Sequence, residues 1–122
     1  MIEAILAPMA YDEETANRIR ELVQSEEGLS EMRMFGGLAF LINGNMAVAA
    51  SGKGGLLLRC DPEDTEALTA APDAGRFEMR GKEMNGWLRV DPPAIKTDAG
   101  LQRWVRVGVR YARSLPPKDS ST

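Results

Sequence analysis

The stretch MRMFGGLAFLING, Met32 to Gly44, decides the fold because it predicts one side of a buried β-hairpin. Its aliphatic and aromatic residues, with a period near two, are typical of a strand. Asn43 and Gly44 are the preferred pair for a two-residue type I′ turn. We therefore expect a strand over 33–42 to fold back on a strand over 45–51.

Two adjacent glycines, Gly36 and Gly37, interrupt this predicted strand. Glycine has no side chain to pack there and raises the entropy cost of ordering the backbone. One interpretation is a bend or bulge that lets a long strand curve under the last helix. The other is a point where a second backbone or a ligand approaches the sheet closely. We favour the bend.

A helix precedes the hairpin, over 12–27. Asp12 is a natural N-cap, acidic residues follow in the first turn, and Gly28 is a stop signal. Ala16, Ile19 and Val23 recur at helical spacing. This helix is expected to pack one side and expose the other.

The rest of the chain continues the pattern of turns, strands and helices. The loop 51–55 turns the chain into a third strand, and Asp61 followed by Pro62 predicts a short helix to about Ala70. A second hairpin is expected over 76–90, with its turn at Gly81. The last helix is predicted from Thr97 or Asp98 to about Ser114, ahead of two prolines.

The expected order is therefore helix, three strands, helix, two strands, helix. Antiparallel strand groups with helices on one face make a two-layer α+β domain. We place a single domain over 9–118, with a polar tail over 119–122. Residues 1–8 precede a second start-like phrase at Met9, and we interpret them as an extension that is disordered or that marks an alternative translation start.

The chain of 122 residues contains no histidine and one cysteine, Cys60. Histidine is the commonest general acid or base near neutral pH and the commonest metal ligand, so triads built on it and the usual zinc sites are excluded. No pair of carboxylates or lysines has a recognisable catalytic spacing. We expect no enzyme, no cofactor and no metal, and we interpret Cys60 as a small core residue.

The N-terminal residues lack the basic start and the apolar run of a secretory signal. No stretch approaches the roughly 20 apolar residues that a membrane-spanning helix needs. A lone cysteine fits a reducing compartment. We expect a cytoplasmic protein that does not enter a membrane.

Charge is unevenly distributed along the chain. Residues 1–31 hold eight acidic and two basic residues, whereas residues 76–118 hold ten basic and four acidic ones. Four of the basic residues recur at spacings of three, four and three on the last helix, which places them on one face. This arginine stripe consists of Arg103, Arg106, Arg110 and Arg113.

The arginine stripe is the best candidate binding surface in the sequence. Guanidinium groups on one helix face can contact phosphates or the carboxylates of a partner. The alternative is a solvated helix face, balanced by acids of the first helix and by the helix dipole. The acidic pI near 5.0 argues against nucleic acid.

Other features have simpler interpretations. Ser51-Gly-Lys-Gly-Gly55 lacks the spacing and the following helix of a phosphate-binding loop, so it is interpreted as a turn. Trp87, Trp104 and the methionines at 32, 34, 46, 79 and 84 could line a greasy pocket, but methionine readily fills irregular cores, so we expect them in the core.

Four phrases, in order and spacing, resemble the N-terminal domain of the TfoX/Sxy family. They are MFGGLAFLINGNMAV, GGLLLR, MRGKEMNGWLRV and WVRVGVRYARSLPPK, and they include Gly36, Gly37 and Gly44 as signature glycines. The resemblance covers the chain from Met9 to Lys118 and implies the α+β fold of that domain. Relatives that add a helical C-terminal domain regulate bacterial natural competence and are linked to the cyclic-AMP receptor protein. We expect a stand-alone N-terminal domain.

Three functional hypotheses follow. The leading one is a non-enzymatic regulatory or protein-binding domain with an unidentified protein partner, including a homodimer formed through a sheet edge or the charged helix faces. The second is nucleic-acid binding through the arginine stripe. The third is a small-molecule binder or an unrecognised enzyme that uses carboxylates or Lys53.

Overall fold

The structure is a computed structural model that describes residues 13–34 and 36–118. Three α-helices in these ranges are α1 (Glu13–Val23), α2 (Thr65–Leu68) and α3 (Asp98–Ser114). The strands there are β1 (Leu29–Met34), β2 (Gly37–Ile42), β3 (Asn45–Ala50), β4 (Leu56–Arg59), β5 (Ala74–Met79) and β6 (Lys82–Val90). Short 3₁₀ helices over Pro62–Asp64 and Pro92–Ile95 precede α2 and α3.

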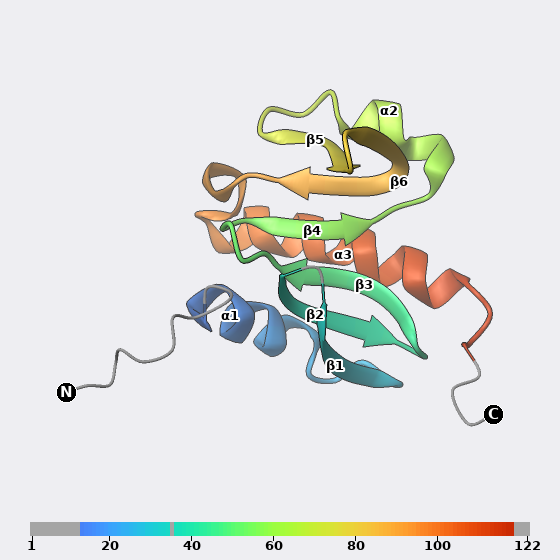
Figure 1. The fold of residues 1–122 in the computed structure, drawn as a ribbon. Helices are drawn as coiled ribbons and strands as arrows, with labels where there is room; N and C mark the ends of the chain where they lie inside the picture. The colour runs from blue at the N-terminus through green and yellow to red at the C-terminus, as the bar shows by residue number, and fades with distance from the viewer. Residues whose placement is uncertain (1–12, 35, 119–122) are drawn as a thin grey trace.

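The strands that the structure describes form one six-stranded antiparallel sheet in the order β1-β2-β3-β4-β6-β5. Helix α3 crosses one face of the sheet against β3 and β4, and α1 packs beside it, as Figure 1 shows. The two-layer α+β class and the predicted helix–strand order are confirmed. The first strand group, however, contains four strands and not the expected three.

The extra strand arises at Gly36 and Gly37. The expected strand over 33–42 is two strands, because β1 pairs antiparallel with β2 and Met34 lies opposite Gly37. Gly36 has φ +71°, a left-handed conformation that suits glycine in a tight turn. The chain therefore reverses here, and the predicted bend or bulge within one long strand was wrong.

Gly37 has a different requirement from its neighbour. A Cβ atom at Gly37 would overlap the backbone carbonyl oxygen of Ala50 on β3. The alternative interpretation of the two glycines, that a second backbone approaches the sheet closely, is therefore confirmed at Gly37. The irregularity of the β2–β3 pairing lies further along, between Phe40 and Leu41.

The Asn43-Gly44 turn forms as predicted. Asn43 has φ 52° and Gly44 has φ 83°, as a type I′ turn requires, and Ile42 pairs with Asn45. The C-terminal segment packs on this turn, because the Lys118 N–H donates to the Asn43 carbonyl over 2.8 Å. The positive φ of Gly44 explains why glycine occupies this position.

Helix boundaries agree with the sequence at α3 and differ at α1. Thr97 caps α3 by accepting from the Gly100 N–H over 3.0 Å. Helix α1 ends at Val23, four residues before the predicted end, because the Glu26 N–H bonds to the Val23 carbonyl in a tighter turn. The predicted cap at Asp12, the extension over 1–8 and the tail over 119–122 lie outside the described residues.

The core between helices and sheet contains Ile19, Phe40, Leu58 and Trp104. A second apolar cluster lies on the other face of the sheet and explains why β2 and β3 are buried along their whole length. Its buried members are Ala39, Leu41, Met46, Ala49 and Leu57, and its partly buried ones are Met34, Phe77 and Trp87. Core positions are confirmed for Trp104 and Met46, whereas Met32 on the edge strand β1 is 52% exposed.

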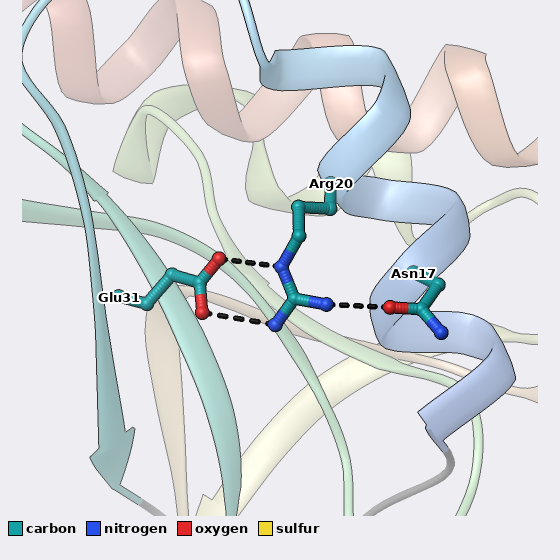
Figure 2. Close-up of polar contacts among 3 residues, drawn as sticks. All are labelled: Asn17, Arg20 and Glu31. Atoms are coloured by element: carbon teal, nitrogen blue, oxygen red, sulfur yellow. Dashed lines mark hydrogen bonds and ion pairs between the residues drawn. The ribbon is translucent and has the colours of Figure 1, made fainter.

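Two contacts hold the helices against the sheet. At Gly108, a Cβ atom would overlap the Ala47 carbonyl oxygen, so glycine lets α3 lie directly on β3. Arg20 of α1 makes a two-pronged ion pair with Glu31 of β1, with N···O distances of 2.7 and 2.9 Å. Figure 2 shows the Arg20 guanidinium between the Glu31 carboxylate and the Asn17 amide.

Candidate functional site

Helix α3 presents two opposite faces. Its buried residues face the sheet, and they are Leu101, Trp104, Val105, Gly108 and Ala112. The arginine stripe lies on the other side, and all four of its residues are exposed. The sequence prediction of one exposed arginine face on the last helix is therefore confirmed in its geometry.

The four guanidinium groups have different surroundings. Arg113 donates to the Glu26 carboxylate, with an Nη2···Oε1 distance of 2.6 Å. The Arg103 guanidinium lies 4.8 Å from the ring centroid of its neighbour Trp104. Arg106 and Arg110 form no ion pair with any residue that the structure describes. These two arginines are therefore available to an external anion.

A shallow groove runs between α1 and α3 on one side of the stripe. We call it the helix groove; it has a volume of about 130 Å³ and is lined by Leu22, Val23, Glu26, Gln102, Val105, Arg106 and Val109. Leu22 is 37% exposed in it. An apolar strip thus borders the arginine stripe.

A larger cleft lies on the other side of the stripe, between α3 and the segment from β4 to α2. This α2–α3 cleft has a volume of about 480 Å³ and is lined by Cys60, Asp61, Asp64, Ala67, Leu68, Val107, Arg110, Tyr111 and Ser114. Asp61 caps the first 3₁₀ helix by accepting from the Glu63 N–H over 2.9 Å. The cleft therefore brings the carboxylates of Asp61 and Asp64 and the guanidinium of Arg110 to one concave surface.

Acidic groups therefore flank the arginine stripe on both sides. Glu26 lies towards α1, and Asp61 and Asp64 lie towards α2. Their fields oppose a long polyanion laid along the stripe, since the like charges repel at distances within a Debye length of about 8–10 Å. A partner with mixed charge avoids this repulsion.

Arg59 is a feature that the sequence analysis did not single out. Its guanidinium carbon lies 5.0 Å from the Trp87 ring centroid and 5.3 Å from that of Tyr111, which also lines the α2–α3 cleft. Its buried Nε has no hydrogen-bond partner among the residues that the structure describes. The sequence signal was an arginine that follows three leucines in a strand, but its ring contacts come from β6 and α3.

Cys60 is a core residue, as expected, with 1% of its surface exposed. Burial raises the pKa of its thiol, although the Thr65 hydroxyl opposes the shift. Thr65 is buried too; its hydroxyl donates to the Pro62 carbonyl and accepts from the Gly86 N–H, each over 2.8 Å. These contacts fasten β6 to the start of α2.

The loop 51–55 is a hairpin connection between β3 and β4, as predicted. The Ser51 hydroxyl accepts from the Lys53 N–H over 3.1 Å and from Arg89 over 3.2 Å. Over residues 13–34 and 36–118, no three histidine, cysteine, aspartate or glutamate side chains gather where they could hold a metal ion. No helix in these ranges is long and apolar enough to cross a membrane.

The fold and its exposed stripe define a small two-layer α+β domain with a basic helix face. The family model of the TfoX N-terminal domain matches residues 21–112, so the chain belongs to the TfoX N-terminal domain family. The matched segment includes the signature glycines and the first three arginines of the stripe, and it ends at Ala112. No curated protein and no solved structure matches the chain.

Proposed function

We propose that this protein is a non-enzymatic regulatory domain that binds another protein through the arginine stripe of α3. The observation that carries the proposal is the exposure of Arg106 and Arg110 on one helix face, without an ion pair among the described residues. Arginine pairs with carboxylates through a planar fork of donors, so the matching partner surface is acidic. The proposal includes a regulatory role of the competence type in a bacterial cytoplasm, and membership of the TfoX N-terminal domain family supports the regulatory part.

A protein partner is favoured over nucleic acid by the flanking acids. Glu26 already occupies Arg113, and Asp61 and Asp64 lie beside Arg110 in the α2–α3 cleft. A nucleic-acid backbone that follows the stripe would pass these carboxylates, which weakens binding. A protein surface can place acidic groups on the stripe and basic or neutral groups beside it.

A non-catalytic role is supported by the chemistry of the side chains. The sequence contains no histidine, and burial raises the pKa of the lone thiol of Cys60, which disfavours the reactive thiolate. Binding through exposed charged groups requires neither a base nor a nucleophile. The stripe therefore supports recognition better than it supports a reaction.

Affinity purification from nuclease-treated lysate tests the proposal. The bait is the full chain, compared with the double variant Arg106→Ala and Arg110→Ala. A matched control, Lys53→Ala with Lys82→Ala, removes the same charge from exposed loop and strand positions. We expect a protein to co-purify with the parent and the control and to fall at least about tenfold with the stripe variant, since two charge-assisted contacts exceed 1.4 kcal/mol. Equal recovery with all three baits contradicts the proposal.

A gel shift addresses the nucleic-acid alternative. The parent protein and the variant with all four stripe arginines changed to alanine are titrated into labelled duplex DNA and single-stranded RNA at low salt. The proposal predicts no stable shift for either protein. A shift that disappears in the variant and weakens steeply with salt would favour nucleic acid instead.

A further inference from the structure

Helices α1 and α3 run side by side in the same direction. Arg18, in the middle of α1, pairs with Asp98, the first residue of α3, over 3.3 Å. Further along the chain, Glu26, three residues after the end of α1, pairs with Arg113 in the last turn of α3 over 2.6 Å. The helix layer therefore presents two parallel ridges with the helix groove between them.

The two ridges have opposite charge. The outer face of α1 carries Glu14 and Glu21, which are seven residues and thus about two turns apart, and both are exposed. The outer face of α3 carries the arginine stripe. Glu21 forms no ion pair with any residue in the described ranges, and the same holds for Arg106.

An apolar strip separates the ridges. Leu22 is 37% exposed there, and the half-buried Val109 lies with it in the helix groove. A seam of apolar side chains between a row of acids and a row of bases is the pattern by which paired helices select a partner. The required partner has a similar apolar strip, with basic groups opposite the acidic ridge of α1 and acidic groups opposite the arginine stripe of α3.

A second copy of this chain meets that requirement. A two-fold axis that runs along the helix groove places α1 of each copy over α3 of the other, because the helices are parallel and the rotation exchanges the two ridges. Leu22 and Arg106 line the same groove, so Glu21 lies at about the level of Arg106 along the layer. In this arrangement Glu21 of each copy faces Arg106 of the other, so the same contact forms at two symmetry-related places. The apolar strips of the two copies also face each other.

We propose that the chain forms a two-fold dimer through this helix layer, with Glu21 of each copy bound to the arginine stripe of the other. The inference rests on the proposed function, because it names a second copy as the acidic protein that occupies the stripe. Charged side chains make up much of the proposed contact, so salt weakens the dimer. In the dimer, α1 supplies the carboxylates that the stripe recognises.

Sedimentation velocity at low and high salt tests the dimer. The proteins are the parent, Glu21→Arg, Arg106→Glu, the double variant with both changes, and Glu83→Arg as a control on the exposed part of β6. We expect the parent and the control to dimerise at about 20 mM salt and to dissociate at about 500 mM, where the Debye length falls to about 4–5 Å. Each single reversal should weaken the dimer at least about tenfold, and the double variant should restore it.

Two results would overturn the dimer. One is a parent protein that remains monomeric at high concentration and low salt. The other is a dimer that neither single reversal weakens, which would place the contact elsewhere, as at a strand edge. If the parent is monomeric but lysate capture still depends on Arg106 and Arg110, the dimer fails while the proposed function stands. If capture is also independent of them, both fail.

Discussion

The Arg113 guanidinium lies 2.6 Å from the Glu26 carboxylate and joins α3 to the segment that follows α1. This contact anchors one end of the arginine stripe and leaves Arg106 and Arg110 for an outside partner. It also lies at the rim of the helix groove, where the proposed second copy would bind.

The Arg113–Glu26 pair should add little stability. The two side chains are 38% and 34% exposed, so water and salt screen their attraction. Glu26→Gln should lower the free energy of unfolding by about 0.2–1 kcal/mol at low salt, and by less at high salt. Urea unfolding at both salt concentrations measures this. Glu27→Gln, an exposed neighbour, is the control; an equal loss there would show that the pair is not the cause.

The adjacent glycines Gly36 and Gly37 should respond differently to alanine. Gly36 has open space around a Cβ but a φ of +71°, so Gly36→Ala should cost about 1–2 kcal/mol, and Gly36→Asn less. Gly37→Ala should cost more, about 2–3 kcal/mol or above, because the Ala50 carbonyl cannot move without shifting β3. Thermal unfolding compares the variants. A milder effect at Gly37 than at Gly36 would contradict this account of the turn.

Removing the Thr65 hydroxyl should destabilise the fold. Thr65→Val preserves the shape but leaves the Gly86 N–H without its acceptor, which costs about 1–3 kcal/mol. Thr69→Val is the matched control, because the Thr69 hydroxyl donates to the Glu66 carbonyl at the exposed end of α2. Denaturant unfolding should show a clear loss for the first variant and a small one for the second. Equal losses would argue against a special role for Thr65.

Acid should weaken the link between α1 and β1. The hydrogen bonds from Arg20 lower the pKa of Glu31 below its ordinary value of 4.5, against a smaller opposing effect of burial. A carboxyl with a lowered pKa in the folded state stabilises the fold above its unfolded pKa, and this stabilisation is lost as the pH falls through the folded pKa.

Glu31→Gln tests this linkage. The parent should lose up to about 1 kcal/mol more than the variant between about pH 6 and pH 3, since the pair is partly exposed. Urea unfolding across that range gives both curves. Parallel curves would show that Glu31 does not contribute to the acid sensitivity.

Local signals made much of the fold predictable. Asn43-Gly44 determines its own turn through backbone conformation, and the Thr97 cap and the two prolines bound α3 within a few residues of sequence. The turn at Gly36 was missed because adjacent glycines fit both a bulge and a reversal. The pairing of β1 with β2, in which Met34 lies opposite Gly37, distinguishes a reversal from a bulge, and the glycine pair alone does not indicate it.

The candidate site was predictable only in part. Helical spacing placed the arginine stripe on one face, because that periodicity is local. The pairing of Arg113 with Glu26 joins residues 87 positions apart, and the stacking of Arg59 depends on rings from β6 and α3. Met32 was expected in the core but lies on an edge strand, whose exposure depends on the order of the whole sheet.

The central claim is that a protein binds at the exposed face of α3, and site-specific photocrosslinking in living cells tests it most directly. A benzoylphenylalanine side chain replaces Gln102, which is exposed on α3 beside the stripe, or Glu83 on β6 as the control position. We expect a protein adduct from position 102 that is lost when Arg106 and Arg110 are alanine, and none from position 83. An adduct from position 102 that persists without the two arginines, or adducts from position 83 alone, would contradict the account.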